Sequence, residues 1–123
     1  MTLMTSEQAI ARLGKRPAVA ASKLLGSEPL EIDAARGFAR IAFLGKVEFC
    51  NGQGVVQGGF LSAMIDEAMA IAATAAKNFD YVVPTLEMKT SYLAPVRPGR
   101  LIAEGQVVTA GQRVGYLEGR LFD

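Results

Sequence analysis

The sequence contains one long apolar stretch that carries two adjacent carboxylates, Asp66 and Glu67. From residue 60 to residue 76 the only other polar residues are Ser62 and Thr74, and no Pro or Gly interrupts the run, so we predict a helix of about five turns. Burying an unpaired carboxylate among apolar side chains is costly, so such a group should be paired, protonated, at a wet interface, or catalytic. Because successive helical residues point about 100° apart, the two carboxylates must have different neighbours. We expect one to be the working group and the other an ion-pair or rim residue.

Two glycines, Gly58 and Gly59, stand at the start of this predicted helix. The first backbone N–H groups of a helix have no partner within it, and they lie at the positive end of the helix dipole. With no Cβ in the way, they form a ready site for an anion or for the oxyanion of a reacting carbonyl group. The alternative interpretation is a tight turn into the helix without a chemical role.

The helix itself separates these two features. Gly58 and Asp66 are eight residues apart, which is about 12 Å along the axis at 1.5 Å per residue. A carbonyl group held at the Gly58 N–H therefore cannot reach the Asp66 carboxylate of the same helix. Two such helices lying antiparallel across a two-fold axis would place the start of one beside the middle of the other. If the two groups act together, the sequence predicts a dimer.

The sequence has no histidine, and this excludes several kinds of catalytic site. Ser-His-Asp and Cys-His arrangements, a histidine general base and a histidine-ligated zinc site all require an imidazole. The single cysteine, Cys50, cannot form an intrachain disulfide or a multi-cysteine metal site, and we expect no metal. Any acid–base or nucleophilic chemistry must therefore come from carboxylates, backbone N–H groups, hydroxyls, Lys, Tyr or Cys50. Among these, Asp66 is the strongest candidate.

Charge and length limit the class of protein further. The chain has 123 residues with 13 basic and 12 acidic side chains, so it lacks the positive charge of proteins that bind nucleic acid or an anionic membrane surface. The paired carboxylates in the central helix argue against a membrane span, and the N-terminal residues show no uninterrupted apolar core of a signal peptide. We expect one domain, residues 1–123, in the cytoplasm, with no nucleic-acid or membrane partner.

The elements around the central helix are typical of the α+β class. A helix from Ser6 to Gly14 and a second short helical stretch form an N-terminal helical segment, residues 1–25. One helix followed by a run of alternating strands predicts an antiparallel meander. The predicted strands are residues 30–43, broken at Gly37 by a turn or a bulge, and residues 81–93, 101–109 and 116–122.

A larger pattern includes both the glycines and the carboxylate. The series N-x-x-G-x-x-Q-G-G begins at Asn51, Asp66 follows seven residues after its last glycine, and the stretch PTLEMKTSYLAPVRPGRLIAEGQVV comes later. Over residues 24–123 this combination resembles the hotdog-fold acyl-CoA thioesterases of the phenylacetate-pathway type. The resemblance implies a hotdog fold, in which a curved antiparallel β-sheet wraps a long central helix, and a homodimer or a dimer of dimers, that is, a homotetramer.

The resemblance also implies a role for each matching residue. The Gly58 N–H would polarise the thioester carbonyl, Asn51 would help to orient the carbonyl or the attacking water, and Asp66 of the partner chain would act as nucleophile or general base. Thr85 occupies a place where the family often has a hydroxyl residue near the carboxylate. The substrate would be an acyl-CoA or aryl-acyl-CoA thioester, hydrolysed to the free acid and coenzyme A without a further cofactor.

Two features depart from the family pattern. Gln57 stands where the family commonly has His, so a role that needs an imidazole is lost, although an amide can still hydrogen-bond the loop or the substrate. Family members also usually continue past the third hairpin strand into a last strand, whereas this sequence ends at Asp123. We therefore expect the sheet to lack an edge strand, with reduced stability or activity.

Three arginines, Arg97, Arg100 and Arg113, lie in predicted surface turns. They are candidates for binding the coenzyme A phosphates because a guanidinium group binds phosphate in a bidentate fork. The alternative interpretation is solvated loop charge.

Other functions compete with hydrolysis. A binding module of the same fold would hold an acyl-CoA or fatty-acyl ligand without turnover, and Gln57 and the expected lack of a last strand favour this hypothesis. Dehydratase or isomerase chemistry is a third hypothesis, but hotdog hydratases usually use a histidine. For Asp66 itself, the alternative role is an ion pair with Lys or Arg at a subunit interface.

Overall fold

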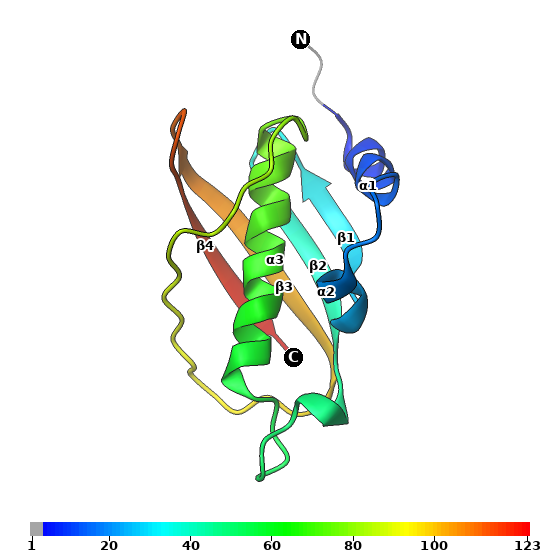
Figure 1. Ribbon diagram of the computed structural model, residues 1–123, viewed down its shortest axis with the longest axis vertical. Helices are drawn as coiled ribbons and strands as arrows, with labels where there is room; N and C mark the ends of the chain where they lie inside the picture. Colours follow the sequence, from blue (N-terminus) through cyan, green and yellow to red (C-terminus); the bar gives the residue numbers. More distant parts are fainter. Residues whose placement is uncertain (1–3) are drawn as a thin grey trace.

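The computed structural model describes residues 4–123 and shows a long helix lying across one face of a four-stranded sheet (Figure 1). In chain order the elements are α1 (Ser6–Gly14), α2 (Ala20–Leu24), β1 (Glu28–Asp33), β2 (Phe38–Gly45), the 3-10 turn η1 (Val47–Phe49), α3 (Gly58–Ala76), β3 (Gly99–Ala110) and β4 (Gly115–Phe122). The arrangement confirms the predicted α+β class and the hotdog fold, with a central helix against a curved antiparallel sheet.

The four strands are antiparallel and follow the order β1-β2-β3-β4, so β1 and β4 are the two edges. β1 and β2 are joined through Gly37, whose φ of 61° lies in the left-handed region where a side chain would be strained. Of the two predictions for this position, the turn between two strands is therefore confirmed. β2 and β3 pair without interruption from Phe38 with Gln106 to Gly45 with Gly99.

The sheet has one apolar and one charged face. The apolar face lies against α3, and its buried side chains are Ile32, Ala39, Ile41, Phe43, Leu101 and Ala103. On the outer face Arg40 of β2 donates to Glu31 of β1 and to Glu104 of β3, at 2.8 Å in each case. These three side chains are partly exposed, so water screens the ion pairs and their contribution to stability is small. The core therefore lies between the sheet and α3.

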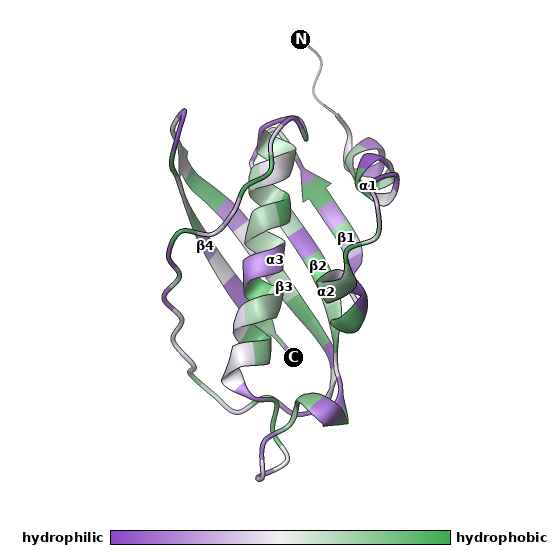
Figure 2. Cartoon of the chain, viewed as in Figure 1, coloured by the Kyte–Doolittle hydropathy of each residue, from purple (hydrophilic) through white to green (hydrophobic). Residues whose placement is uncertain are grey.

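The long helix α3 buries a stripe of residues spaced three or four apart against the sheet. The stripe consists of Leu61, Met64, Ala68, Ala72 and Ala75. Most of the remaining helix surface is also apolar, with a hydrophilic band at its middle (Figure 2). By length and composition α3 could cross a membrane, a property that it shares with the core helices of soluble proteins, and here its buried stripe packs on the sheet.

The N-terminal helices cover one edge of the sheet and agree with the predicted helical segment, of which residues 1–3 lie outside the described residues. Thr5 and Gln8 form a capping box, with Gln8 N–H donating to Thr5 Oγ1 at 3.1 Å. Ser6 Oγ accepts a hydrogen bond from the backbone N–H of Ile32 at 3.0 Å, which joins α1 to β1. α1 is therefore fixed to the edge strand of the sheet.

The prediction of a strand over residues 81–93 was wrong. These residues belong to a segment, residues 81–98, that has no strand and runs from α3 to β3 beside β4 (Figure 1). A strand requires backbone hydrogen bonds to a neighbour. Within the described part of the chain, one backbone hydrogen bond joins this segment to another, from Val56 N–H to Val96 C=O at 2.8 Å. The alternation of residues 81–93 predicted two faces, but it carried no information about a neighbouring strand.

Candidate active site

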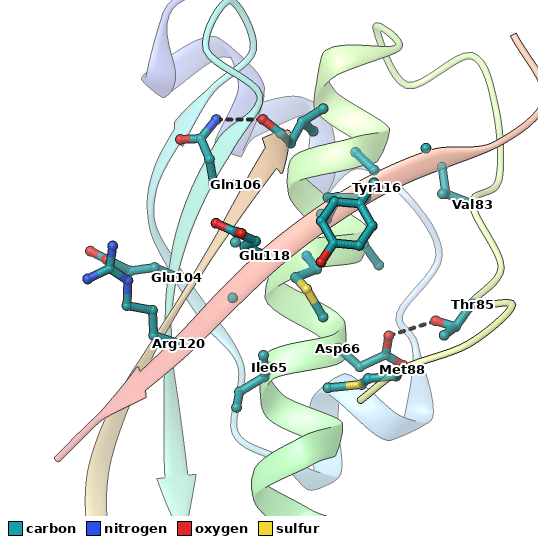
Figure 3. Close-up of a pocket in the computed structure, with 18 of the residues that line it drawn as sticks. Ile65, Asp66, Val83, Thr85, Met88, Glu104, Gln106, Tyr116, Glu118 and Arg120 are labelled. Atoms are coloured by element: carbon teal, nitrogen blue, oxygen red, sulfur yellow. Dashed lines mark hydrogen bonds between the residues drawn. The ribbon is translucent and has the colours of Figure 1, made fainter. Parts of the chain in front are cut away.

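Asp66 lies at the middle of α3, and its side chain points toward the 81–98 segment (Figure 3). Thr85 Oγ1 of that segment donates to Asp66 Oδ1 at 2.6 Å. A hydroxyl donor holds the side chain of a carboxylate in one orientation. The fold therefore brings together the carboxylate and the hydroxyl residue that the resemblance associated with it, both within one chain.

The second carboxylate, Glu67, has other neighbours. Ser22 Oγ of α2 donates to Glu67 Oε1 at 2.8 Å, whereas Glu67 Oε2 is buried without a hydrogen-bond partner in residues 4–123. The expectation that the two carboxylates face different neighbours is confirmed. The expectation that one of them is an ion-pair or rim residue is not, because Glu67 packs under α2 with a hydroxyl as its partner.

The start of α3 presents free backbone donors. Phe60 N–H and Leu61 N–H both turn back to Gln57 C=O, at 3.0 and 3.4 Å, whereas Gly58 N–H and Gly59 N–H have no acceptor within the described residues. Gln57 is the N-cap residue, but its exposed side chain makes no capping hydrogen bond. α3 begins at Gly58 rather than Phe60, so both glycines belong to its first turn.

Three hydroxyl groups gather beside this first turn, and sequence reasoning missed them. Tyr92 OH donates to Gly58 C=O at 3.0 Å, and Ser62 Oγ and Thr90 Oγ1 are hydrogen-bonded at 3.1 Å. Ser62 Oγ and Tyr92 OH also share a short hydrogen bond. Because each hydroxyl has one proton, Ser62 donates to Tyr92 OH when Tyr92 donates to Gly58 C=O, and Thr90 then donates to Ser62. No signal in the sequence connects these residues, because Ser62 lies in an apolar helix and the others in an ordinary alternating run. Together with the bond from Thr85, they attach the 81–98 segment to α3 at two points.

Asn51 lies in the loop between η1 and α3. Its Oδ1 accepts a hydrogen bond from Gln53 N–H at 2.9 Å, and an isolated bridge between Cys50 and Val56 closes the loop. The amide carbonyl is thus occupied in holding the turn, and the Nδ2 group is the part of the side chain that remains for a substrate. Asn51 and Gln57 are both exposed, ahead of the first turn of α3.

The three candidate arginines do not form one cluster in the chain. Arg97 follows Val96, which pairs with Val56 near the start of α3. Arg100 is the second residue of β3 rather than a turn residue, and its Nη1 lies 3.8 Å from Glu28 Oε1. Arg113 belongs to the β3–β4 turn, which contacts the other end of α3 through the bond from Lys77 Nζ to Gly111 C=O at 3.4 Å.

A groove of about 1920 Å³ runs between α3, the 81–98 segment and β4. Asp66, Ile65 and Met88 line it (Figure 3), so the carboxylate faces a long, open groove lined by both apolar and polar groups. Within the described residues no group of three or more His, Cys, Asp or Glu side chains is placed to hold a metal ion.

Comparisons with known proteins agree with this geometry. Residues 53–123 match the family described as the thioesterase superfamily. A protein of Halobacterium salinarum named as an inferred esterase is 41% identical over 69 residues, which cover 54% of this chain and 45% of that protein, so the match spans about half the length of this relative.

Solved structures are similar over more of the chain. A protein of Ralstonia eutropha JMP134, described as an inferred thioesterase related to phenylacetic acid degradation, is 28% identical with a TM-score of 0.87, covering 94% of this chain and 89% of its own. A protein from the phenylacetic acid degradation operon of E. coli is 24% identical with a TM-score of 0.81, covering 96% and 83%, and shows the fold alone. From the fold, the site and the matched residues together, this chain belongs to the thioesterase superfamily.

Proposed function

We propose that this protein hydrolyses an acyl-CoA or aryl-acyl-CoA thioester to the free acid and coenzyme A. The observation that carries the proposal is the Asp66 carboxylate, held by Thr85 at 2.6 Å in the wall of the groove. Membership of the thioesterase superfamily supports hydrolysis of a thioester bond. The coenzyme A part of the substrate rests on the resemblance to thioesterases of the phenylacetate-pathway type.

The Asp66 carboxylate supports two routes. As a general base it takes a proton from water, whose oxygen adds to the carbonyl carbon, and the C–S bond then breaks to release a thiolate that takes up the proton. As a nucleophile it forms an acyl anhydride with release of the thiolate, and water cleaves the anhydride in a second step. In both routes negative charge develops on the carbonyl oxygen, where a preorganised donor such as Gly58 N–H is worth about 3 kcal/mol.

The proposal requires self-association. Gly58 and Asp66 are separated by about 12 Å of one helix, so one chain must bind the carbonyl oxygen while Asp66 of the other chain takes part in the attack on the carbonyl carbon. In a dimer that places Gly58 beside the partner's Asp66, the two-fold axis passes near Ser62, midway between them. Large apolar side chains on the 81–98 segment are exposed in the single chain, with Val82 at 80%, Leu86 at 78% and Leu93 at 93%. A homodimer, or a dimer of dimers, would remove such surface from water.

For the coenzyme A phosphates, the arrangement favours Arg97 and Arg100. Both lie at the end of the fold where α3 starts, and both are exposed. Arg113 lies at the opposite end of α3, so within one chain it cannot bind the same phosphate group. Binding of an acyl-CoA without turnover is the second candidate function, which the exposed Gln57 in place of an imidazole favours.

Release of free thiol from a panel of acyl-CoA esters with short, medium, long and aromatic acyl groups tests the proposal. We expect saturable turnover with at least one ester, and the preferred ester would identify the acyl group. Saturable binding without release of thiol from any ester would contradict hydrolysis and favour the binding module. Light scattering over a range of protein concentrations tests the predicted dimer or tetramer.

Thr85→Ala removes the hydrogen bond to Asp66 and leaves the carboxylate free to rotate. We expect kcat to fall about tenfold, in line with the loss of roughly 1.5 kcal/mol for a hydrogen bond to a charged group. Thr85→Ser keeps the hydroxyl and serves as the matched control, with kcat close to that of the wild type. Steady-state kinetics on the preferred ester measure both variants, and equal kcat values for all three proteins would exclude a role for the hydroxyl.

A further inference from the structure

The side chain of Tyr92 packs on the first turn of α3, and the reaction proposed above gives it no role. Its ring lies against Gly58, where a Cβ would meet Tyr92 Cζ at 2.9 Å. Its hydroxyl donates to Gly58 C=O at 3.0 Å and shares a hydrogen bond with Ser62 Oγ. The ring and the hydroxyl of Tyr92 therefore both contact Gly58. Only glycine at position 58 permits this close approach.

The carbonyl that Tyr92 binds belongs to the peptide unit that carries the Gly59 N–H. A hydrogen bond accepted by the oxygen of a peptide group polarises that group and makes its N–H a stronger donor. Gly59 N–H has no acceptor within residues 4–123, and a Cβ built on Gly59 meets nothing within 4 Å. Like Gly58 N–H, it lies in the first turn and points away from the helix. The two donors are thus adjacent and without an acceptor in residues 4–123, and the space beside Gly59 is open.

We propose that Tyr92 is a positioning residue for the thioester site. It fixes and polarises the Gly58–Gly59 peptide, so that Gly59 N–H acts with Gly58 N–H as a pair of donors to the carbonyl oxygen of the substrate. The proposal rests on the proposed function, and it adds a second donor and the residue that orients it. Ser62 completes the arrangement, because its hydroxyl contacts Tyr92 OH and is itself bonded to Thr90 Oγ1.

A role for these hydroxyls as a mere attachment of the 81–98 segment predicts different results. Loosening the segment would affect substrate binding and the Thr85 contact to Asp66 together, because one segment carries both Thr85 and Tyr92. Loss of polarisation at one peptide acts on the developing oxyanion and leaves the ground state almost untouched, so it lowers kcat and leaves KM unchanged.

The kinetic test compares Tyr92→Phe with Ser91→Ala, using the wild-type oligomer and its preferred ester. Phe keeps the ring against Gly58 and removes only the hydroxyl, whereas Ser91 is an exposed neighbour whose side chain has no hydrogen-bond partner among residues 4–123. We expect Tyr92→Phe to lower kcat about two- to fivefold, because a neighbouring hydrogen bond strengthens an oxyanion donor by roughly 10–30%, with an unchanged KM and an unchanged kcat for Ser91→Ala. A rise in KM alone, or equal kinetics for the two variants, would overturn the proposal.

A second measurement needs no activity, so it separates this inference from the proposed function. The amide proton of Gly59 should resonate at lower field in the wild type and in Ser91→Ala than in Tyr92→Phe, because the hydroxyl that polarises its peptide is lost only in the last. If no ester is hydrolysed but this shift is found, the proposed function fails and the assignment of Tyr92 to the Gly58–Gly59 peptide stands. A Gly59 resonance that does not move in Tyr92→Phe would overturn the assignment, whatever the kinetics.

Discussion

Asp66→Asn is expected to lower the turnover of the preferred acyl-CoA ester about 1000-fold while the protein stays folded and associated. An amide has nearly the shape of the carboxylate and can still accept the hydrogen bond from Thr85. It can neither take a proton from water nor attack a carbonyl carbon, and general-base or nucleophilic groups typically contribute 100- to 10,000-fold, about 1000-fold at the centre of that range. Thiol release at saturating ester measures the loss, and light scattering shows whether the oligomer persists.

Glu67→Gln is the matched control for this experiment. It makes the same chemical change one residue further along α3, where the side chain faces Ser22 instead of the groove. We expect its turnover to equal that of the wild type. The competing role for Asp66, an ion pair across a subunit interface, predicts the reverse for Asp66→Asn, namely a weakened oligomer with hydrolysis retained. Such a result would remove Asp66 from the reaction.

The central helix and the four observed strands could be predicted because each depends on a local pattern, whereas the pairing of β2 with β3 was not predicted. The apolar run of α3 has no breaker inside it, Gly37 marks a position where only a residue tolerant of positive φ fits, and the last two strands alternate on either side of a turn. The segment at 81–93 shows the limit of such patterns. It alternates as well as β4 does, but pairing depends on a neighbour that alternation does not specify.

Only part of the candidate site could be predicted from the sequence, because local patterns do not specify which distant residues come into contact. Asp66 stood out because a carboxylate is rare in so apolar a helix, and helix geometry alone separated it from Gly58. The position of Thr85 came from a resemblance, not from any rule of spacing. Tyr92 and Ser62 are 30 residues apart, and a contact of that kind is set by the path of the 81–98 segment over α3. The helix and strand propensities of the individual residues do not indicate this contact.

The close approach of α3 to β3 leads to the prediction with the largest effect on stability. A Cβ on Gly105 would lie 2.6 Å from both Ala68 O and Met69 Cα. These are backbone atoms, so no side-chain rotation relieves the overlap, and the helix must move away from the sheet. We expect Gly105→Ala to lower the free energy of unfolding by about 3 kcal/mol, at the upper end for overpacked cores, and the melting temperature by roughly 10 °C.

Gly115→Ala in β4 is the control, since its Cβ would meet nothing nearer than Thr109 O at 3.4 Å, an ordinary contact. Alanine is favoured over glycine in a strand by roughly 0.5–1 kcal/mol, so this variant should be as stable as the wild type or slightly more stable. Urea unfolding at one fixed protein concentration compares the three proteins, because association also shifts apparent stability. Equal midpoints for Gly105→Ala and the wild type would show that α3 can move without cost. Because Asp66 lies less than one turn before Ala68 and Met69, a costly shift of α3 should also lower kcat, through displacement of the carboxylate from Thr85.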